Sequence, residues 1–182
     1  MRDAAWPARV TAPVTPEVVD VCVLHREPSA RGRADAGPDH RWRVLVLQRG
    51  AETRCAGSWE LVHGRIEHEE RAEDAAVREV REETGLGVTR LYCVTVSAFY
   101  LPSRGVKTAV VFAAVVGERG RAAEPILGPE HVAARWLTLP AAMRAVTWPR
   151  EREALQHVAH LLRTGDAGVA EDVLRVPLAA EG

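Results

Sequence analysis

Lysine, cysteine, aromatic residues and long apolar runs are all scarce in this 182-residue chain. Lys107 is the only lysine, so arginine carries almost all of the positive charge, and the formal net charge is −1. A nearly neutral chain offers no broad basic surface for a nucleic-acid polymer or an anionic membrane. No apolar run reaches the length of about 18 residues that a membrane span needs, and the first residues do not read as a signal peptide. We therefore expect a cytoplasmic protein whose partners include neither a membrane nor a nucleic-acid polymer.

The three cysteines are odd in number, lie far apart and form no CxxC pair. This pattern suggests neither a disulfide framework nor a zinc site, so we expect Cys22, Cys55 and Cys93 to be free thiols. The length fits one domain with a substantial core. The few aromatic residues that could hold a planar ring, or alternatively pack in the core, are Trp42, Phe99, Tyr100, Phe112 and Trp148.

An acidic stretch from Gly64 to Leu86 dominates the middle of the chain. Its second part, residues 72–84, is predicted to form a helix that ends at a left-handed Gly85. Residues three and four apart stack on one helix face, so Glu79, Glu82 and Glu83 share a face. Clustered carboxylates favour a hard cation such as Mg²⁺, whereas the alternative is a solvated face paired with nearby arginines.

The spacing in this stretch follows one fixed pattern. A glycine is followed after five residues by a glutamate, after seven more by Arg-Glu-Val, and then by Glu-Glu and Gly-Leu, each pair after one further residue. The pattern resembles the Nudix box, and its positions are filled by Gly64, Glu70, Arg78, Glu79, Val80, Glu82, Glu83, Gly85 and Leu86. The resemblance implies an α/β fold of the α/β/α sandwich type, with a central mixed sheet between helices. Strand-like and helix-like segments before and after the acidic helix agree with this fold class.

The resemblance also implies roles for individual residues. Glu79, Glu82 and Glu83 are expected to hold Mg²⁺, with Mn²⁺ as a possible substitute, and one of them is expected to help activate water. Glu70 and Arg78 are expected to pair and to join the loop to the helix. The candidate catalytic residues are thus Glu79, Glu82, Arg78 and, from a loop nearer the C-terminus, Glu130. The candidate substrate contacts are Arg49, Arg54, His63 and Gly64.

The rest of the chain is organised around this motif. Residues 1–16 are expected to be an irregular lead-in, residues 17–164 the Nudix domain, and residues 165–182 a loose tail or an arm in a monomer or homodimer. The loop at residues 28–40 reads as a hairpin tip or as a phosphate-reaching arm. Strands are expected at 18–24, 43–47, 59–62, 90–101, 108–116 and 131–139, and helices at 140–145 and from Pro149 onward.

Substrate class depends on residues outside the box. Residues 130–137, Thr147-Trp148 and residues 153–155 resemble the dihydroneopterin triphosphate and dATP pyrophosphohydrolase branch. In that branch Glu130 would lie over the metals as an extra ligand or general base; the alternative is a plain loop glutamate. We therefore expect Mg²⁺-dependent cleavage of a phosphoanhydride in a nucleoside or pterin triphosphate, releasing pyrophosphate and a monophosphate.

Two other functions stay open. Pro102 resembles the downstream proline of ADP-ribose pyrophosphatases. A Nudix-like module that binds a nucleotide without cleaving it is the non-enzymatic alternative, although such modules commonly lose box glutamates that are present here. His63 stands where the superfamily usually has a glycine, so it either narrows the loop or brings an imidazole near a leaving phosphate. His68-Glu69 replaces the usual proline-glycine.

Overall fold

The computed structural model describes residues 15–27, 41–117, 124–164 and 171–178. The loop at 28–40 therefore lies outside the described residues, as do residues 1–14 of the lead-in. The strands are β1 (Val18–Arg26), β2 (Trp42–Arg49), β3 (Trp59–Glu60), β4 (Val62–Arg65), β5 (Val88–Leu101), β6 (Gly105–Val116), β7 (His131–Thr138) and β8 (Arg175–Val176). The helices are α1 (Ala72–Thr84), α2 (Leu139–Ala145), α3 (Pro149–Leu161), the 3-10 turn η2 (Leu162–Thr164) and α4 (Glu171–Leu174).

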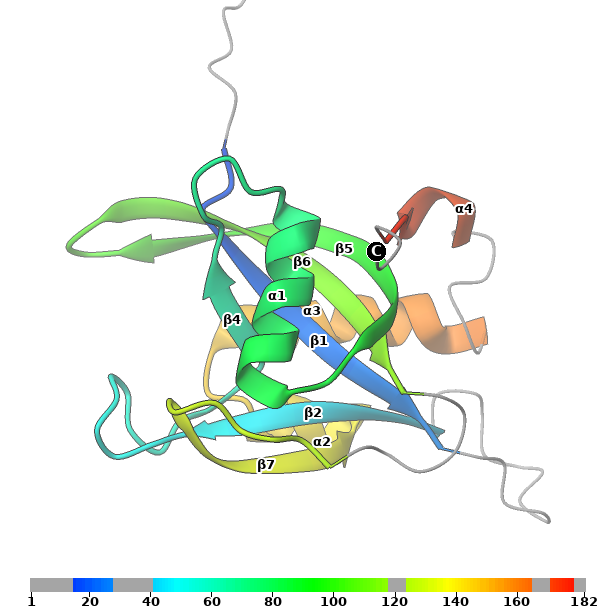
Figure 1. The fold of residues 1–182 in the computed structure, drawn as a ribbon, viewed down its shortest axis with the longest axis horizontal. Helices are drawn as coiled ribbons and strands as arrows, with labels where there is room; N and C mark the ends of the chain where they lie inside the picture. Colours follow the sequence, from blue (N-terminus) through cyan, green and yellow to red (C-terminus); the bar gives the residue numbers. More distant parts are fainter. Residues whose placement is uncertain (1–14, 28–40, 118–123, 165–170, 179–182) are drawn as a thin grey trace, which may run out of the picture.

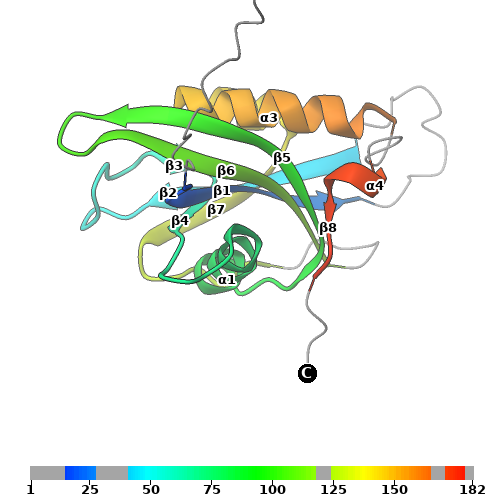
Figure 2. The same ribbon diagram turned by 90° about the horizontal axis from the view of Figure 1, so that it is seen from above.

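The eight strands form one mixed sheet. Its order is β3-β2-β1-β6-β5-β8, with β4 paired to β1 and β7 paired to β2. Strand β1 runs parallel to β6 and antiparallel to both β2 and β4. Helix α1 covers one face of the sheet, and α2 and α3 cover the other (Figures 1 and 2). The predicted sandwich with a mixed sheet between helices is confirmed.

Strand β1 is apolar on both faces because it lies inside the sheet between two helical layers. Val19, Val21 and Val23 belong to the cluster that packs against α1, whereas Cys22 and Leu24 belong to the cluster beneath α2 and α3. Successive strand residues point to opposite faces, so one strand supplies valines to one core and Cys22 and Leu24 to the other.

Helix α1 has the predicted bounds. Ala75, Ala76 and Val80 are buried against the sheet, and these small side chains let the helix lie close to the strands. Gly85 has a φ of 67°, and its N–H donates to the Arg81 carbonyl at 2.8 Å. Glycine adopts this left-handed conformation without a Cβ penalty, so it ends the helix as predicted.

Helix α3 also follows its sequence pattern. Pro149 lies in its first turn, and Leu155, Val158 and Leu162 are buried. His157 and His160 are exposed. The helix therefore packs through its apolar side.

Two expectations need correction. The expected strand at 59–62 is divided at Leu61 because β3 pairs with β2 while β4 pairs with β1. The C-terminal segment is not loose throughout, since residues 171–178 include α4 and β8, and β8 adds to the edge of the sheet beside β5. The Tyr92 hydroxyl, 3.0 Å from both Glu171 carboxylate oxygens, helps to hold this segment. Residues 165–170 and 179–182 are outside the described part.

Within the described residues, no helix is both long enough and apolar enough to cross a membrane. The three cysteines are free thiols, with Cys22 buried and Cys55 exposed.

Candidate active site

The first structural feature of the site is the close approach of β4 to α1. A Cβ atom placed on Gly64 would lie 1.8 Å from the Glu79 Cδ and 1.9 Å from its Oε1. Any side chain at position 64 would therefore displace the Glu79 carboxylate. Gly64 acts in this site through its lack of a side chain.

Arg78 joins the preceding loop to the helix. Its Nε donates to Glu70 Oε1 at 2.9 Å, and its Nη2 donates to Glu70 Oε2 at 3.0 Å and to the Arg65 carbonyl at 2.8 Å. The expected pair is thus present. The Glu70 carboxylate also accepts the Glu67 backbone N–H, and Arg78 together with this bond holds the pKa of Glu70 below its usual value.

Arg78 also contacts two of the expected metal ligands. Its Nη1 donates to Glu79 Oε1 at 2.9 Å and to Glu82 Oε2 at 3.1 Å. Glu79 is only 12% exposed, whereas Glu82 is 59% exposed. The Nη1 side of the guanidinium therefore balances the negative charge of the acidic face, while Nε and Nη2 hold the loop.

Glu83 is the least satisfied of the three carboxylates. Its Oε2 is buried and has no hydrogen-bond partner among the described residues. Burial, together with the nearby carboxylates of Glu79, Glu60 and Glu130, raises the pKa of Glu83 to about 9. Burial also raises the pKa of Glu79. Both effects indicate a place where negative charge is concentrated and a cation would be stabilised.

The donor set suits a hard divalent cation, because carboxylate oxygens are its preferred protein ligands. The orphaned oxygen of Glu83 supports this fit. In the part of the chain that the structure describes, however, no three carboxylate, imidazole or thiolate groups already converge on one point. A cation would have to draw the three glutamates together and compete with Arg78 for Glu79 and Glu82.

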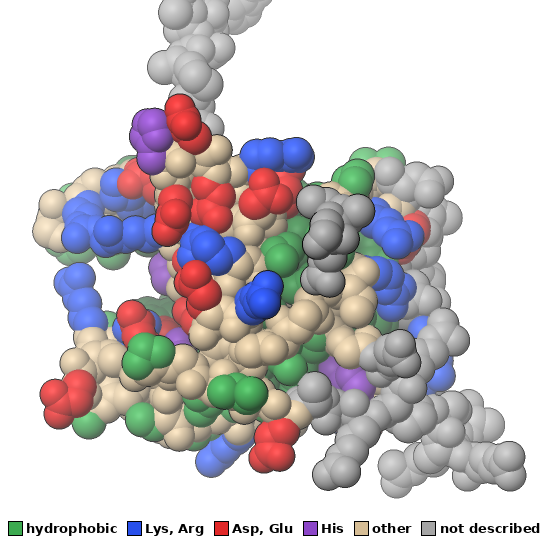
Figure 3. Space-filling view, in the orientation of Figure 1, with side chains coloured by type: hydrophobic (Ala, Val, Ile, Leu, Met, Phe, Trp, Pro, Cys, Tyr) green, Lys and Arg blue, Asp and Glu red, His purple; other side chains and the backbone are tan. Residues whose placement is uncertain are grey.

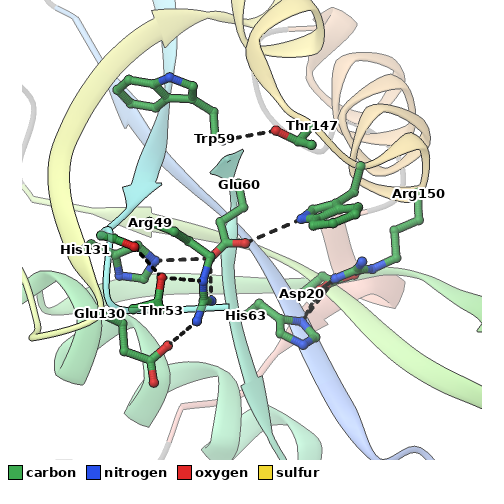
Figure 4. A network of polar contacts seen from close by, with 12 residues as sticks. Asp20, Arg49, Thr53, Trp59, Glu60, His63, Glu130, His131, Thr147 and Arg150 are labelled. Carbon is green, nitrogen blue, oxygen red and sulfur yellow. Dashed lines mark hydrogen bonds and ion pairs between the residues drawn. The ribbon is translucent and has the colours of Figure 1, made fainter. Parts of the chain in front are cut away.

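A second network includes Glu60, Glu130 and Arg49, whose charges influence Glu83. Arg49 donates from Nη1 to Glu60 at 2.8 Å and from Nη2 to Glu130 at 2.7 Å (Figure 4). His131 Nε2 lies 3.2 Å from Glu60, and Trp148 Nε1 donates to Glu60 at 3.4 Å. Burial alone would raise the pKa of Glu60, but the bonds from His131 and Arg49 hold it below its usual value.

This network places two predicted residues and adds a new one. Arg49 and Glu130 are in contact with each other, and the Glu130 carboxylate is close enough to influence Glu83. Glu60 was not expected in the site. Its signal in the sequence is a lone glutamate within the strand-like segment before the box.

A third cluster joins three elements. Asp20 on β1 contacts His63 on β4 and Arg150 on α3 (Figure 4). Burial would raise the pKa of Asp20, but hydrogen bonds from His63 and Arg150 hold it below its usual value. Sequence reasoning missed Asp20 and Arg150. The available signal was a single aspartate inside an otherwise apolar strand.

A cavity of 1370 Å³ lies beside these networks. Three of the predicted substrate contacts line it, namely Arg49, Arg54 and His63. Gly64 and the three expected metal ligands Glu79, Glu82 and Glu83 do not. In Figure 3 the molecule is hollowed between the tip of the β5–β6 hairpin and the loop after β2, with Lys and Arg side chains around the opening.

The aromatic candidates divide into two groups. Phe99, Tyr100 and Trp148 line the cavity. Trp42 and Phe112 are buried in the two cores.

Two curated proteins are similar to this chain in sequence. A curated relative, the octanoyltransferase of Myxococcus xanthus, is 32% identical over 154 residues, which cover 81% of this chain but 38% of that protein. The 8-oxo-dGTP diphosphatase of Proteus vulgaris is 34% identical over 61 residues, covering 34% of this chain and 54% of that protein. The chain thus spans about half or less of the length of these relatives.

Solved structures support the fold. The dihydroneopterin triphosphate pyrophosphohydrolase of E. coli superposes with a TM-score of 0.53 at 24% identity, covering 78% of this chain and 97% of that one. The family model for the NUDIX domain matches residues 17–158. With the box residues assembled around α1 and this match over most of its length, the chain belongs to the NUDIX domain family.

Proposed function

We propose that this protein is a divalent-metal-dependent hydrolase that cleaves a phosphoanhydride bond in a nucleoside or pterin triphosphate, releasing pyrophosphate and a monophosphate. The observation that carries this proposal is the buried, unpartnered carboxylate oxygen of Glu83 beside Glu79. Such an arrangement is unfavourable by itself and becomes favourable when a cation binds. The cavity lined by Arg49, Glu60 and Glu70, which contact or influence this acidic face, gives a substrate room.

Glu79, Glu82 and Glu83 would hold Mg²⁺ or Mn²⁺. When bound, such an ion neutralises diphosphate charge, polarises phosphorus and lowers the pKa of a coordinated water. Arg78 keeps Glu79 and Glu82 in place and fixes the loop that borders the site. Gly64 leaves the space that the Glu79 carboxylate occupies.

Glu130 is our candidate to accept a proton from the attacking water. Its carboxylate is 60% exposed, Arg49 pairs with both it and Glu60, and both carboxylates influence Glu83. Arg49 and Arg54 line the cavity and are suited to contact phosphate oxygens, because guanidinium groups pair well with phosphates. Phe99 and Trp148 supply aromatic surface for the ring of the substrate.

The triphosphate class has support from the relatives that are named for such substrates, an 8-oxo-dGTP diphosphatase and a dihydroneopterin triphosphate pyrophosphohydrolase. All box glutamates are retained, which argues against a module that only binds. We also infer that the protein works in the cytoplasm.

The test is product release from a panel of dihydroneopterin triphosphate, nucleoside triphosphates, ADP-ribose and dinucleoside polyphosphates, with and without Mg²⁺. We expect metal-dependent pyrophosphate release from a triphosphate, and a loss of about 100-fold or more in Glu83→Gln because a charged ligand is removed. Asp74→Asn, an exposed carboxylate on the same helix, is the matched control and should behave like the wild type.

Other outcomes separate the alternatives. AMP release from ADP-ribose in place of pyrophosphate release would transfer the assignment to a nucleoside diphosphate-X pyrophosphatase. Binding of these compounds without any metal-dependent turnover would favour the non-catalytic module. Full activity of Glu83→Gln would contradict the metal-ligand assignment.

A further inference from the structure

Asp20 is an unusual residue in the interior of this fold. It is 1% exposed in the middle of β1, and its neighbours Val19 and Val21 are fully buried core residues. Burying a carboxylate is strongly unfavourable unless it is paired and hydrogen-bonded. Its two partners, His63 and Arg150, come from different elements, so the three residues form one unit, which we call the Asp20 cluster.

Asp20 holds Arg150 through two bonds. Arg150 Nε donates to Oδ2 at 2.9 Å, and Arg150 Nη2 donates to Oδ1 at 3.1 Å. The guanidinium carbon also lies 4.8 Å from the centroid of the Phe99 ring. With Asp20 bonded to one edge of the guanidinium and the Phe99 ring against one face, the group has little freedom to rotate.

Asp20 also fixes the imidazole of His63. The distance from His63 Nδ1 to Asp20 Oδ1 is 2.6 Å, which requires a proton between the two atoms, so Nδ1 carries it. In the neutral ring Nε2 is then a hydrogen-bond acceptor. The ring is 30% exposed and lines the cavity.

Two nitrogen atoms of the cluster remain open toward a ligand. Within the described residues, neither His63 Nε2 nor Arg150 Nη1 has a hydrogen-bond partner. Both residues line the cavity, and Arg150 Nη2 lies only 3.3 Å from His63 Nδ1. The cluster therefore has an acceptor, His63 Nε2, and a charged donor, Arg150 Nη1, on two residues that line the same cavity.

The sheet register places this pair on the side of β4 away from the box glutamates. Asp20 is opposite His63 and Val19 is opposite Gly64 in the β1–β4 ladder. Adjacent strand residues face opposite ways, so His63 faces α3 while Gly64 faces Glu79 on α1. One cavity is lined by Glu70 and Ala72 at the start of α1 and also by His63, Arg150, Phe99 and Trp148. A substrate in this cavity can therefore reach from the start of α1 to the Asp20 cluster.

Resting on the proposed function, we propose that His63 and Arg150, positioned by Asp20, are specificity-determining residues that recognise the lactam edge of an oxo heterocycle such as guanine, uracil or a pterin. Arg150 Nη1 donates to the ring carbonyl, and the adjacent ring N–H donates to His63 Nε2. An amino group in place of the carbonyl would set donor against donor and leave both unpaired. Sites built around such bonds discriminate strongly against a ligand that cannot form them.

The test is equilibrium binding of GMP, UMP, AMP and CMP in the absence of metal, by calorimetry. For the wild type we expect GMP and UMP to bind about 10-fold or more tightly than AMP and CMP. Asp20→Asn keeps the side-chain volume but loses the charge that positions His63 and Arg150. The preference for GMP and UMP over AMP and CMP should therefore fall to about twofold or less. His63→Ala, at a partly exposed position, tests the same point without a change in the core. His157→Ala, on the exposed side of α3, should keep the wild-type preference.

The ratio of the dissociation constants separates recognition of the base from a general loss of structure. A structural defect would weaken the binding of all four nucleotides together. Equal binding of GMP and AMP by the wild type would overturn the proposal, as would an unchanged preference in both Asp20→Asn and His63→Ala. Metal-dependent turnover and its loss in Glu83→Gln are measured separately. A failure of turnover would therefore reject the proposed function and leave the binding ratio to decide on the Asp20 cluster.

Discussion

Replacing Arg78 with alanine should destabilise the metal-free protein more than any exposed substitution on the same helix. Arg78 is 25% exposed and bonds to three carboxylates and one backbone carbonyl. Its removal leaves Glu79 at 12% exposure with no cation beside it and releases Glu70 from the helix. The loss therefore affects both the charge balance and the loop.

The magnitude follows from these contacts. The pair with Glu82 is largely exposed and contributes little. The bonds to Glu70 and Glu79 are partly shielded, and a hydrogen bond to a charged group contributes about 1.5–3 kcal/mol net. After allowance for solvent screening we expect a loss of about 3 kcal/mol in the free energy of unfolding. For a chain of this size that corresponds to a fall of about 10 °C in the Tm.

The pH dependence has a definite sign. Above about pH 4.5, the unfolded-state value, Glu70 is ionised and its lowered folded-state pKa stabilises the wild type; that contribution is lost as the pH falls through the folded pKa. In Arg78→Ala the raised pKa of Glu79 rises further, so the variant loses stability as the pH increases. Both effects make the difference between the two proteins large at neutral pH and small at acid pH.

Urea unfolding in EDTA at several pH values measures this difference. Arg81→Ala, exposed on the same helix, is the matched control and should change stability by no more than about 0.5 kcal/mol. A double-mutant cycle with Glu70→Gln isolates the pair, and we expect a coupling energy above about 1 kcal/mol. A loss below 1 kcal/mol, or one that does not vary with pH, would refute the reasoning.

Three further predictions concern single sites. Gly64→Ala should lower divalent-cation affinity and turnover because the new Cβ displaces the Glu79 carboxylate, and a cation titration measures this. Gly87→Ala is the control, because a Cβ there meets nothing within 4 Å, and it should leave the affinity unchanged. Cation binding should release a proton near neutral pH, and the affinity should increase as the pH rises toward 9, because the pKa of Glu83 is raised to about 9 and this ligand must ionise. Calorimetry in buffers of different ionisation enthalpy measures the number of protons released, and binding without proton release would contradict the prediction. Glu151 is fully buried, and burial raises its pKa well above the usual value. As the pH rises between the unfolded-state and the folded-state pKa of this carboxyl, the stability of the wild type should fall relative to Glu151→Gln by about 1.4 kcal/mol for each pH unit; the same pH dependence for both free energies of unfolding, measured in urea from about pH 5 to 8, would disprove this.

The local elements and the acidic face follow from the sequence because their signals are local. Helical spacing places Glu79, Glu82 and Glu83 on one face whatever surrounds the helix, and Gly85 ends it through its own backbone freedom. The pairing of Glu70 with Arg78 is also within reach of a sequence argument, since a short loop joins them.

Other features depend on which strands become neighbours. Asp20 and Arg150 are 130 residues apart, and they meet only because β1 lies at the centre of the sheet and α3 covers it. Arg49 and Glu130 are 81 residues apart and meet because β2 pairs with β7. The docking of β8 onto β5 has the same origin, and the two residues of that strand carry too little pattern to predict it.

The family motif, the helix that carries it and the chemistry of its carboxylates therefore follow from the order of residues, because these depend on spacing along one element. The pairing of buried charges, the burial of a Glu83 oxygen away from any partner among the described residues, and the lining of the cavity depend instead on the assembled fold. These features depend on which distant strands pair with each other. The pairing is determined by the burial of the whole sheet, and no single segment of the chain contains that information.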